Sequence, residues 1–451
     1  MREGSLEAPT RHRIDWQGAD FYDRAKIDAE MHRVFDICHG CRRCFNLCDS
    51  FPRLFDLVDN SATGEVDGVS AGDYAKVVEA CTLCDMCFMT KCPYVPPHPW
   101  AVDFPHLMLR YRAADFRDGK LAWSKRQLVE TDRNGRLAGA VAPLANWAGK
   151  TGNGLTRPAM ERLAGIDRRA ELPEFHRRSF ARSAQEAAPA RDESAPARNR
   201  KAVLYATCFV NYNHPRIGEA ARAVLARNGV LTEVAYPRCC GMPQLEQGDI
   251  ARVAEHAKAG AAALGPFIAE GYDVVALTPS CALMLKFEWP LILPDDAAVK
   301  RLAQATFDIS EYVVDIARKE GLAPGLAPLP GGVSLHLACH ARAQNMGPKA
   351  AEMLRLLPGT EVAVIERCSG HGGSWGVTKA NFWTALKVGR PVARQAATNA
   401  KAYLASECPL AAMHIAQGME AQDASKTPSK QRHPIELMAV VYGLLAEPAA
   451  G

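Results

Sequence analysis

Eight cysteines near the N-terminus have the residue type and the spacing of iron–sulfur ligands. They lie in two runs, ICHGCRRCFNLCD and ACTLCDMCFMTKCPY, with Cys38, Cys41, Cys44 and Cys48 in the first and Cys81, Cys84, Cys87 and Cys92 in the second. Soft thiolates suit iron, and gaps of two residues let a chain curl around one corner of a cubane and offer ligands to three irons. The spacing therefore predicts two [4Fe–4S] clusters.

The assignment of ligands follows from a rule for proteins with two such clusters, in which the fourth cysteine of each run binds the other cluster. It predicts one cluster on Cys38, Cys41, Cys44 and Cys92, and the other on Cys81, Cys84, Cys87 and Cys48. Asp49 replaces the proline that commonly follows such a run, and the second run has an extra residue before Cys92. Both departures concern the fourth ligands and not the existence of clusters. Structural zinc is an alternative, but closely spaced thiolate triplets fit zinc ribbons poorly.

The sequence pattern of the C-terminal half indicates two copies of one α/β module. Strand-like runs alternate with amphipathic helices, and the pattern occurs twice. In the first copy the strands are expected at 202–207, 230–235 and 273–277 and the helices at 217–227 and 249–264; in the second they are expected at 333–338, 361–365 and 402–405 and at 349–357 and 388–400. The motifs RCCG at 238–241 and RCSG at 367–370 support a duplication, since the flanking cysteines recur at nearly the same offset.

The first copy offers four thiols that suffice for a third cluster: Cys208, Cys239, Cys240 and Cys281. Adjacent cysteines cannot both reach one iron of a cubane without strain, but they can ligate neighbouring irons of an opened cluster. Gly241 lets the backbone approach the sulfurs closely, and Cys208 and Cys281 each follow a strand-like run, where α/β modules place functional groups.

The second copy keeps three cysteines: Cys339, Cys368 and Cys408. Its ligand set could be completed by a histidine or a hydroxyl, and the nearest histidines in sequence are His371, His340 and His414. Alternatively this copy is degenerate and purely structural, and His371 in SGHGGSWG is merely hydrogen-bonded within a glycine-rich turn.

Composition restricts the class of protein. The chain has 451 residues, of which 48% are hydrophobic and 23% charged, which predicts two or three domains and excludes a disordered or fibrous chain. Fifteen cysteines cannot all pair in disulfides within one chain, and the charge of +4 does not argue for nucleic-acid binding. The first nine residues lack the apolar core of a secretory signal. We therefore expect a cytoplasmic protein that binds no nucleic acid.

Between the cysteine-rich parts lies a basic, cysteine-free stretch. Residues 106–200 contain 19 Lys and Arg against 11 Asp and Glu, which could form a docking face for an acidic partner or simply a solvated surface. A helix is expected at 103–111, and the Ala/Pro/Arg/Ser-rich stretch 175–200 is expected to be an exposed connector.

Several segments together resemble one known family. They are the two cysteine runs, VPPHPWAVDFPHLMLR after Cys92, YATCFVNYNHP at 205–215, RCCGMP at 238–243, and the stretches 333–346 and 366–376. Over roughly residues 30–445 the chain is similar to the heterodisulfide-reductase-related iron–sulfur proteins, and within them to the C subunits of anaerobic glycerol-3-phosphate dehydrogenases.

The resemblance implies a multidomain α+β fold. Residues 1–100 would form a mostly α-helical ferredoxin-type domain with two [4Fe–4S] clusters, and 101–200 a basic helical segment and linker. Residues 201–325 and 326–451 would form a pseudo-symmetric tandem of α/β cysteine-rich modules of the CCG type. The family's module ends in C-x-x-C, but Met284 and Ala411 stand at the last position here, and Ser369 replaces the second cysteine of the pair in copy two. The second module is thus partly degenerate.

The same resemblance implies an electron-transfer subunit with little activity alone. It would relay electrons between a flavoprotein dehydrogenase, or another redox protein, and a quinone or other acceptor. The alternative is a thiol–disulfide or peroxide-linked reductase component that acts at the cysteine-rich site. Association with the inner face of the cell membrane is a further expectation, for which the apolar stretch 434–446 is either a surface contact or a core helix.

Overall fold

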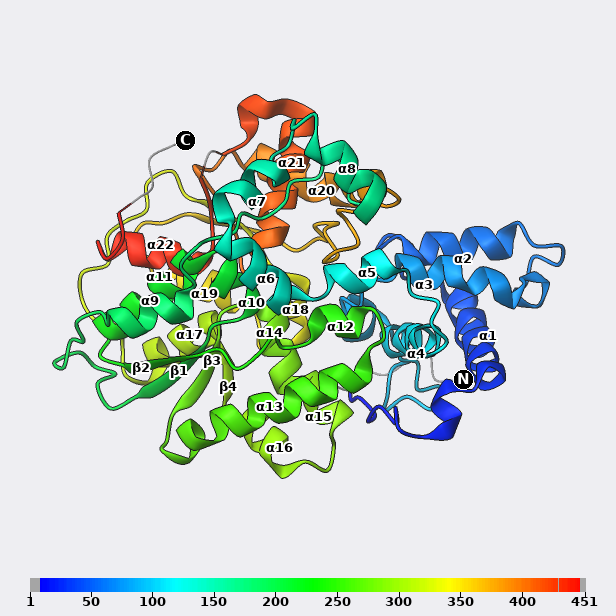
Figure 1. The fold of residues 1–451 in the computed structure, drawn as a ribbon, viewed down its shortest axis with the longest axis horizontal. Helices are drawn as coiled ribbons and strands as arrows, with labels where there is room; N and C mark the ends of the chain where they lie inside the picture. Colours follow the sequence, from blue (N-terminus) through cyan, green and yellow to red (C-terminus); the bar gives the residue numbers. More distant parts are fainter. Residues whose placement is uncertain (1–8, 429, 447–451) are drawn as a thin grey trace.

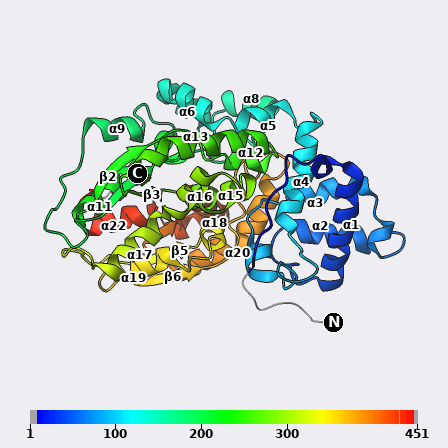
Figure 2. The same cartoon turned by 90° about the horizontal axis from the view of Figure 1, so that it is seen from below.

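The structure is a computed structural model that describes residues 9–428 and 430–446. A helical N-terminal part lies beside a larger α/β part, and a string of helices from the middle of the chain covers one side of the latter (Figures 1 and 2). Among the described residues no helix is long and apolar enough to cross a membrane.

The N-terminal part is built from four main helices. They are α1 (Arg24–Cys41), α2 (Ser50–Asp59), α3 (Tyr74–Ala80) and α4 (Phe104–Arg117). Helix α1 buries Ile27, Met31 and Phe35, which recur at the spacing of one helical face. Phe35 packs edge-on against Tyr74 of α3, with ring centroids 5.1 Å apart, and Phe51 of α2 packs on Phe104 of α4 at 4.7 Å. This aromatic core holds together the helix ends from which the cysteines project, and the predicted helical domain is confirmed.

The middle stretch is helical and lies against the α/β part. Its helices are α5 (Trp123–Leu128), α6 (Thr131–Ala140), α7 (Ala142–Gly149), α8 (Thr156–Ala164) and α9 (Phe180–Glu186). The stretch 175–200 is mostly exposed, as expected of a connector, but it is anchored to the first module. Phe180 is 1% exposed and packs against Gly218, and the Arg222 guanidinium donates to the carbonyls of Ala184 and Ala187. One buried aromatic ring and one arginine therefore anchor a segment whose composition gave no sign of these contacts.

Two parallel four-stranded sheets of the same topology form the α/β part. Strand order is β2-β1-β3-β4 in the first sheet and β6-β5-β7-β8 in the second. The strands are β1 (Lys201–Tyr205), β2 (Leu231–Ala235), β3 (Asp273–Ala276), β4 (Thr306–Asp308), β5 (Val333–His336), β6 (Val362–Ile365), β7 (Tyr403–Ser406) and β8 (Lys430–Arg432). The predicted duplication is confirmed, but β4 and β8 escaped prediction because three residues are too few to show a period.

Helices connect the strands of each module. The first module contains α10 (Cys208–Tyr212), α11 (Pro215–Arg227), α12 (Met242–Glu246), α13 (Ile250–Ala269), α14 (Pro279–Leu283), α15 (Trp289–Ile292), α16 (Ala297–Gln304) and α17 (Ile309–Lys319). The second contains α18 (Cys339–Ala343), α19 (Lys349–Arg355), α20 (Phe382–Asn399), α21 (Pro409–Asp423) and α22 (Pro434–Val441). Helix α22 buries Ile435, Leu437 and Met438 in a core shared by both modules and packs on α11. The stretch 434–446 thus contributes a core helix, not the membrane contact considered above.

Candidate iron–sulfur sites

The first cysteine set, set A, consists of Cys38, Cys41, Cys44 and Cys92. Cys38 and Cys41 lie on the last turn of α1, and the chain reverses at Arg42, whose φ of 51° is left-handed. Cys92 follows a single π-helical turn, Cys87–Lys91. All four sulfur-bearing residues line one small cavity together with Phe51, Phe55 and Val102. Burial raises the pKa of the Cys38 thiol, and the nearby Cys92, Cys44 and Cys41 raise it further. The structure therefore places Cys92 with the first run.

The second set, set B, consists of Cys48, Cys81, Cys84 and Cys87. Burial raises the pKa of Cys48, and the neighbours that raise it next are Cys84 and Cys81, from the other run. Cys81 follows the end of α3, and the loop behind it turns through Leu83 and Asp85, both at positive φ (48° and 64°). The backbone N–H groups of Leu83 and Met86 donate toward the sulfurs of Cys81 and Cys84. Such N–H donors stabilise negative charge on sulfur.

The third set, set C, consists of Cys208, Cys239, Cys240 and Cys281 in the first module. The Sγ atoms of Cys208 and Cys239 are 3.7 Å apart, and those of Cys240 and Cys281 are 3.1 Å apart. Both separations exceed the ~2.05 Å of a disulfide, and all four thiols are free. Gly241 follows the adjacent pair with a φ of 88°, and a Cβ there would stand 3.2 Å from Val253. Glycine therefore permits the turn that brings both cysteines to the same place as Cys208 and Cys281.

A hydrogen-bonded shell fixes the backbone around set C. The Cys239 N–H donates to Asp132 Oδ2 over 3.0 Å, and the Tyr236 hydroxyl donates to the other oxygen of that carboxylate. The Trp289 indole N–H donates to the carbonyl of Cys240 over 2.9 Å. Asp132 belongs to α6, so the helical middle stretch takes part directly in shaping this set.

The fourth set, set D, consists of Cys339, Cys368 and Cys408 in the second module. Burial raises the pKa of the Cys339 thiol, and the nearby thiols of Cys84, Cys368 and Cys408 raise it further. Cys368 also lies near Cys84 and Cys48, so the second module presents Cys339 and Cys368 to set B, with Cys408 behind Cys339.

His371, a candidate fourth ligand of set D, lies beside His414. The centroids of the two rings are 5.9 Å apart, and Nε2 of each is buried without a hydrogen-bond partner. Within residues 9–428 and 430–446, no hydrogen bond or ring contact connects His371 to a cysteine. Burial lowers the pKa of His371 to about 3, so the ring is neutral.

His340 connects three of the cysteine sets. It follows Cys339 of set D, its Nδ1 lies 2.8 Å from the Ser280 hydroxyl, and its Nε2 lies 3.3 Å from the carbonyl of Leu83. Ser280 precedes Cys281 of set C, and Leu83 precedes Cys84 of set B. Burial lowers the pKa of His340, so the ring is neutral; Nε2–H then donates to Leu83 while Nδ1 accepts from Ser280.

Sequence reasoning missed several of these positions. Asp132 and Trp289 carry no motif, and their roles arise from contacts between segments more than forty residues apart. Ser280 could have been found, because it precedes Cys281 at the end of a strand-like run. His340, a candidate ligand by sequence, is bonded to Ser280 and Leu83 in the structure.

Comparison with known proteins identifies the modules. The family model of the CCG cysteine-rich domain matches residues 202–286 and 333–416. Lactate utilization protein A of Geobacillus thermodenitrificans is 31% identical over 189 residues, which cover 39% of this chain and 74% of that protein. The chain belongs to the CCG cysteine-rich domain family.

Two further relatives of this CCG protein are named as subunits of redox enzymes. The C subunit of the anaerobic glycerol-3-phosphate dehydrogenase of Escherichia coli is 26% identical over 315 residues, 69% of this chain and 75% of that protein. The B subunit of the fumarate reductase (CoM/CoB) of Methanothermobacter marburgensis is 25% identical over 245 residues, 53% of this chain and 46% of that protein. The family resemblance read from the motifs is thus confirmed, and these two relatives are parts of larger redox enzymes.

Proposed function

We propose that the chain is an iron–sulfur electron-transfer subunit with [4Fe–4S] clusters at sets A and B and a third iron–sulfur cluster at set C. One observation carries the proposal: Cys92 lies with the first run and Cys48 with the second. This exchange is the ligand pattern of two-cluster ferredoxins. It also keeps the two clusters close together, as one-electron transfer between them requires.

The residues present fit such clusters. Sets A, B and C each have four free thiols, and set A lines an apolar cavity that also contains Arg43 and Lys91. Among the residues that the structure describes, no three Cys, His, Asp or Glu side chains converge closely enough for a single ion. Bound there, the clusters would supply one-electron redox chemistry, and nearby cations and N–H donors would set the potentials.

Set D has only three thiols, and no histidine contact completes it within the described part of the chain. We therefore propose that the second module serves to dock the N-terminal part and not to hold a fourth cluster. Its Cys339 and Cys368 lie beside set B, and its His340 links set B to set C.

A direct thiol–disulfide reaction at set C is the competing function. Cys239, Cys240 and Cys281 are 1%, 2% and 4% exposed, and only Cys208 of set C is partly exposed, which leaves a disulfide substrate little access to the sulfurs. Burial thus favours electron relay. The substrate chemistry would come from a partner; we propose a flavoprotein dehydrogenase, with a quinone or another acceptor downstream. We also propose a reducing, cytoplasmic location, since free thiols persist there.

Potentiometric reduction of anaerobically purified chain, followed by EPR, tests this function. We expect reversible uptake of at least one electron at each of sets A and B without loss of iron. Metal that does not change redox state would contradict the proposal. Turnover of small disulfides by the reduced chain would instead support the competing function.

A further inference from the structure

A cavity of about 510 Å³ opens next to set C but outside it. Its walls come from α6, α10, the loop after β2, and α12 and α13. A cavity of this size suits a small organic molecule. It also lies at the carboxyl ends of parallel strands β1 and β2, where open α/β sheets bind ligands.

The floor of the cavity connects to the cysteines. Asp132 and Tyr236 line it, and the same Asp132 accepts the N–H of Cys239 over 3.0 Å. Thr131, also in the lining, lies beside Cys208 and Cys239. A molecule in the cavity would therefore be separated from set C by a single layer of side chains.

The charge of the cavity is positive once its internal contacts are considered. Glu130 is paired with Arg252 at 3.0 Å, and both oxygens of Asp132 already accept hydrogen bonds. Arg136 and Arg238 are exposed, and in the part of the chain that the structure describes neither guanidinium makes a hydrogen bond or an ion pair. Two arginines are thus available for an anion.

The cavity also presents aromatic surface. The rings of Tyr212 and Tyr236 stand edge to face, with centroids 5.8 Å apart and planes at 87°. Gly135 makes this arrangement possible, because a Cβ there would lie 2.3 Å from the Tyr212 ring. Helix α6 can approach Tyr212 this closely only with glycine at that position.

We propose that this cavity binds a small redox-active organic anion, with its carboxylate, sulfonate or phosphate group on Arg136 and Arg238 and its body against Tyr212 and Tyr236. This inference rests on the proposed function, because it makes the cavity the place where electrons leave or enter at set C. For a quinone-type anion, two successive one-electron transfers and two protons from water give the hydroquinone.

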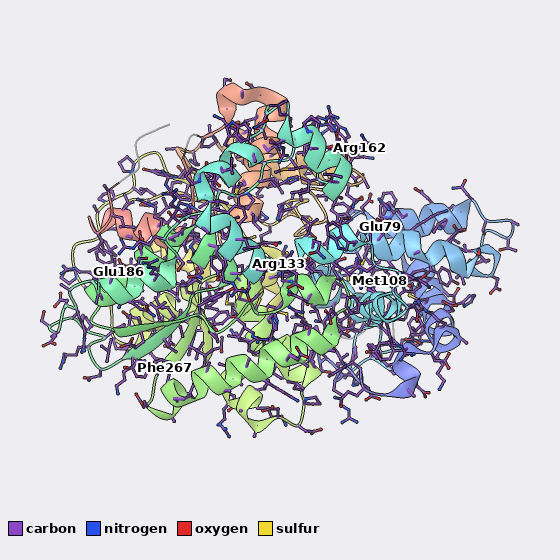
Figure 3. The ribbon with its side chains drawn as sticks, viewed as in Figure 1. Glu79, Met108, Arg133, Arg162, Glu186 and Phe267 are labelled. Carbon is purple, nitrogen blue, oxygen red and sulfur yellow. The ribbon has the colours of Figure 1, made fainter. Side chains whose placement is uncertain are left out.

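The first test is binding to the oxidised full-length chain, which does not depend on electron transfer. The probe is anthraquinone-2,6-disulfonate, titrated calorimetrically. We expect one site per chain and about tenfold weaker binding in Arg136→Gln or Arg238→Gln, as loss of one charge-assisted hydrogen bond predicts. Arg162→Gln on α8, away from the cavity, is the matched control (Figure 3). Equal effects of all three substitutions would overturn the proposal.

The second test compares acceptors. The reduced chain is reoxidised by anthraquinone-2,6-disulfonate or by the neutral duroquinone. We expect Arg136→Gln and Arg238→Gln to slow reoxidation by the anion only. Equal slowing with both acceptors would contradict an anion site. A chain that cannot be reduced would contradict the proposed function. The binding titration would still test whether the cavity binds the anion.

Discussion

At the scale of single residues, Cys48 and Cys92 are the two side chains on which the proposed sharing of clusters depends. Cys48 lies beside Cys84 and Cys81 of the second run, and Cys92 lines one cavity with the first three cysteines of the first run. A chain in which each run held its own cluster would not need this exchange. The positions of Cys48 and Cys92 therefore agree with the rule for two-cluster proteins.

Substitution of each fourth cysteine should disturb the cluster of the opposite run. We expect Cys92→Ala to alter the same EPR signal as Cys38→Ala, and Cys48→Ala the same signal as Cys81→Ala, because each pair shares a set. Low-temperature EPR of the four anaerobically prepared variants checks this. If Cys92→Ala instead resembles Cys81→Ala, the exchange does not occur.

At the scale of elements, the packing of α14 on α18 joins the two modules next to the cysteines. Cys281 and Cys339 lie on these short helices, and His340 on α18 bonds to both Ser280 and Leu83. A continuous hydrogen-bonded route from set B to set C results.

We expect His340→Leu to slow electron transfer between sets B and C severalfold while both clusters remain bound, because the route loses both of its hydrogen bonds. Stopped-flow reduction with separate spectral signals measures it. His336→Leu is the matched control: His336 is also buried, but it bonds to Ser406 and to the Arg367 carbonyl within the second module. Equal slowing in both variants would argue for general destabilisation.

At the scale of the whole molecule, one buried arginine ties the N-terminal part to the first module. Arg11 pairs with Asp85 at 2.7 Å, Asp103 at 3.0 Å and Glu288 at 3.0 Å. His106 adds a contact to Glu288 at 3.2 Å. Removal of Arg11 would leave the buried Asp85 and Glu288 and the partly buried Asp103 without their shared cation.

Arg11→Ala should lower the free energy of unfolding by about 3–5 kcal/mol, the usual cost of breaking a buried ion pair from one side. Anaerobic urea unfolding measures the change. The control is Arg390→Ala on the exposed side of α20, for which we expect a change within about 0.5 kcal/mol. Similar losses in both variants would show that the network does not stabilise the fold.

The same network predicts the pH dependence of stability. Burial opposes ionisation of Glu288, but His106 and Arg11 outweigh it and lower the pKa to about 2 from 4.5. The unfolded chain then binds this proton more tightly, so the stabilisation is present above pH 4.5 and is lost as pH falls toward 2. We expect urea unfolding of Glu288→Gln to show a weaker loss of stability over this range than the parent chain. An unchanged pH profile would contradict this role for Glu288.

Much of this architecture could be predicted from sequence because its signals are local. The Cys-x-x-Cys spacings, the strand-like runs and the repeat of RCCG as RCSG all lie within short windows. The contacts of Arg11, Asp132 and His340 could not be predicted, because each joins residues distant along the chain. Phe180 likewise showed its buried role only once α11 was in place.

The most direct test of the account is the iron and acid-labile sulfide content of the anaerobically purified full-length chain, measured beside a Cys240→Ala, Cys281→Ala double variant. Three four-iron clusters predict about twelve irons in the parent and about eight in the variant. About eight irons in both would contradict a cluster at set C. The chain would then be a two-cluster ferredoxin whose cysteine-rich modules hold no cluster. Fewer than about eight in the parent would contradict the paired N-terminal clusters themselves.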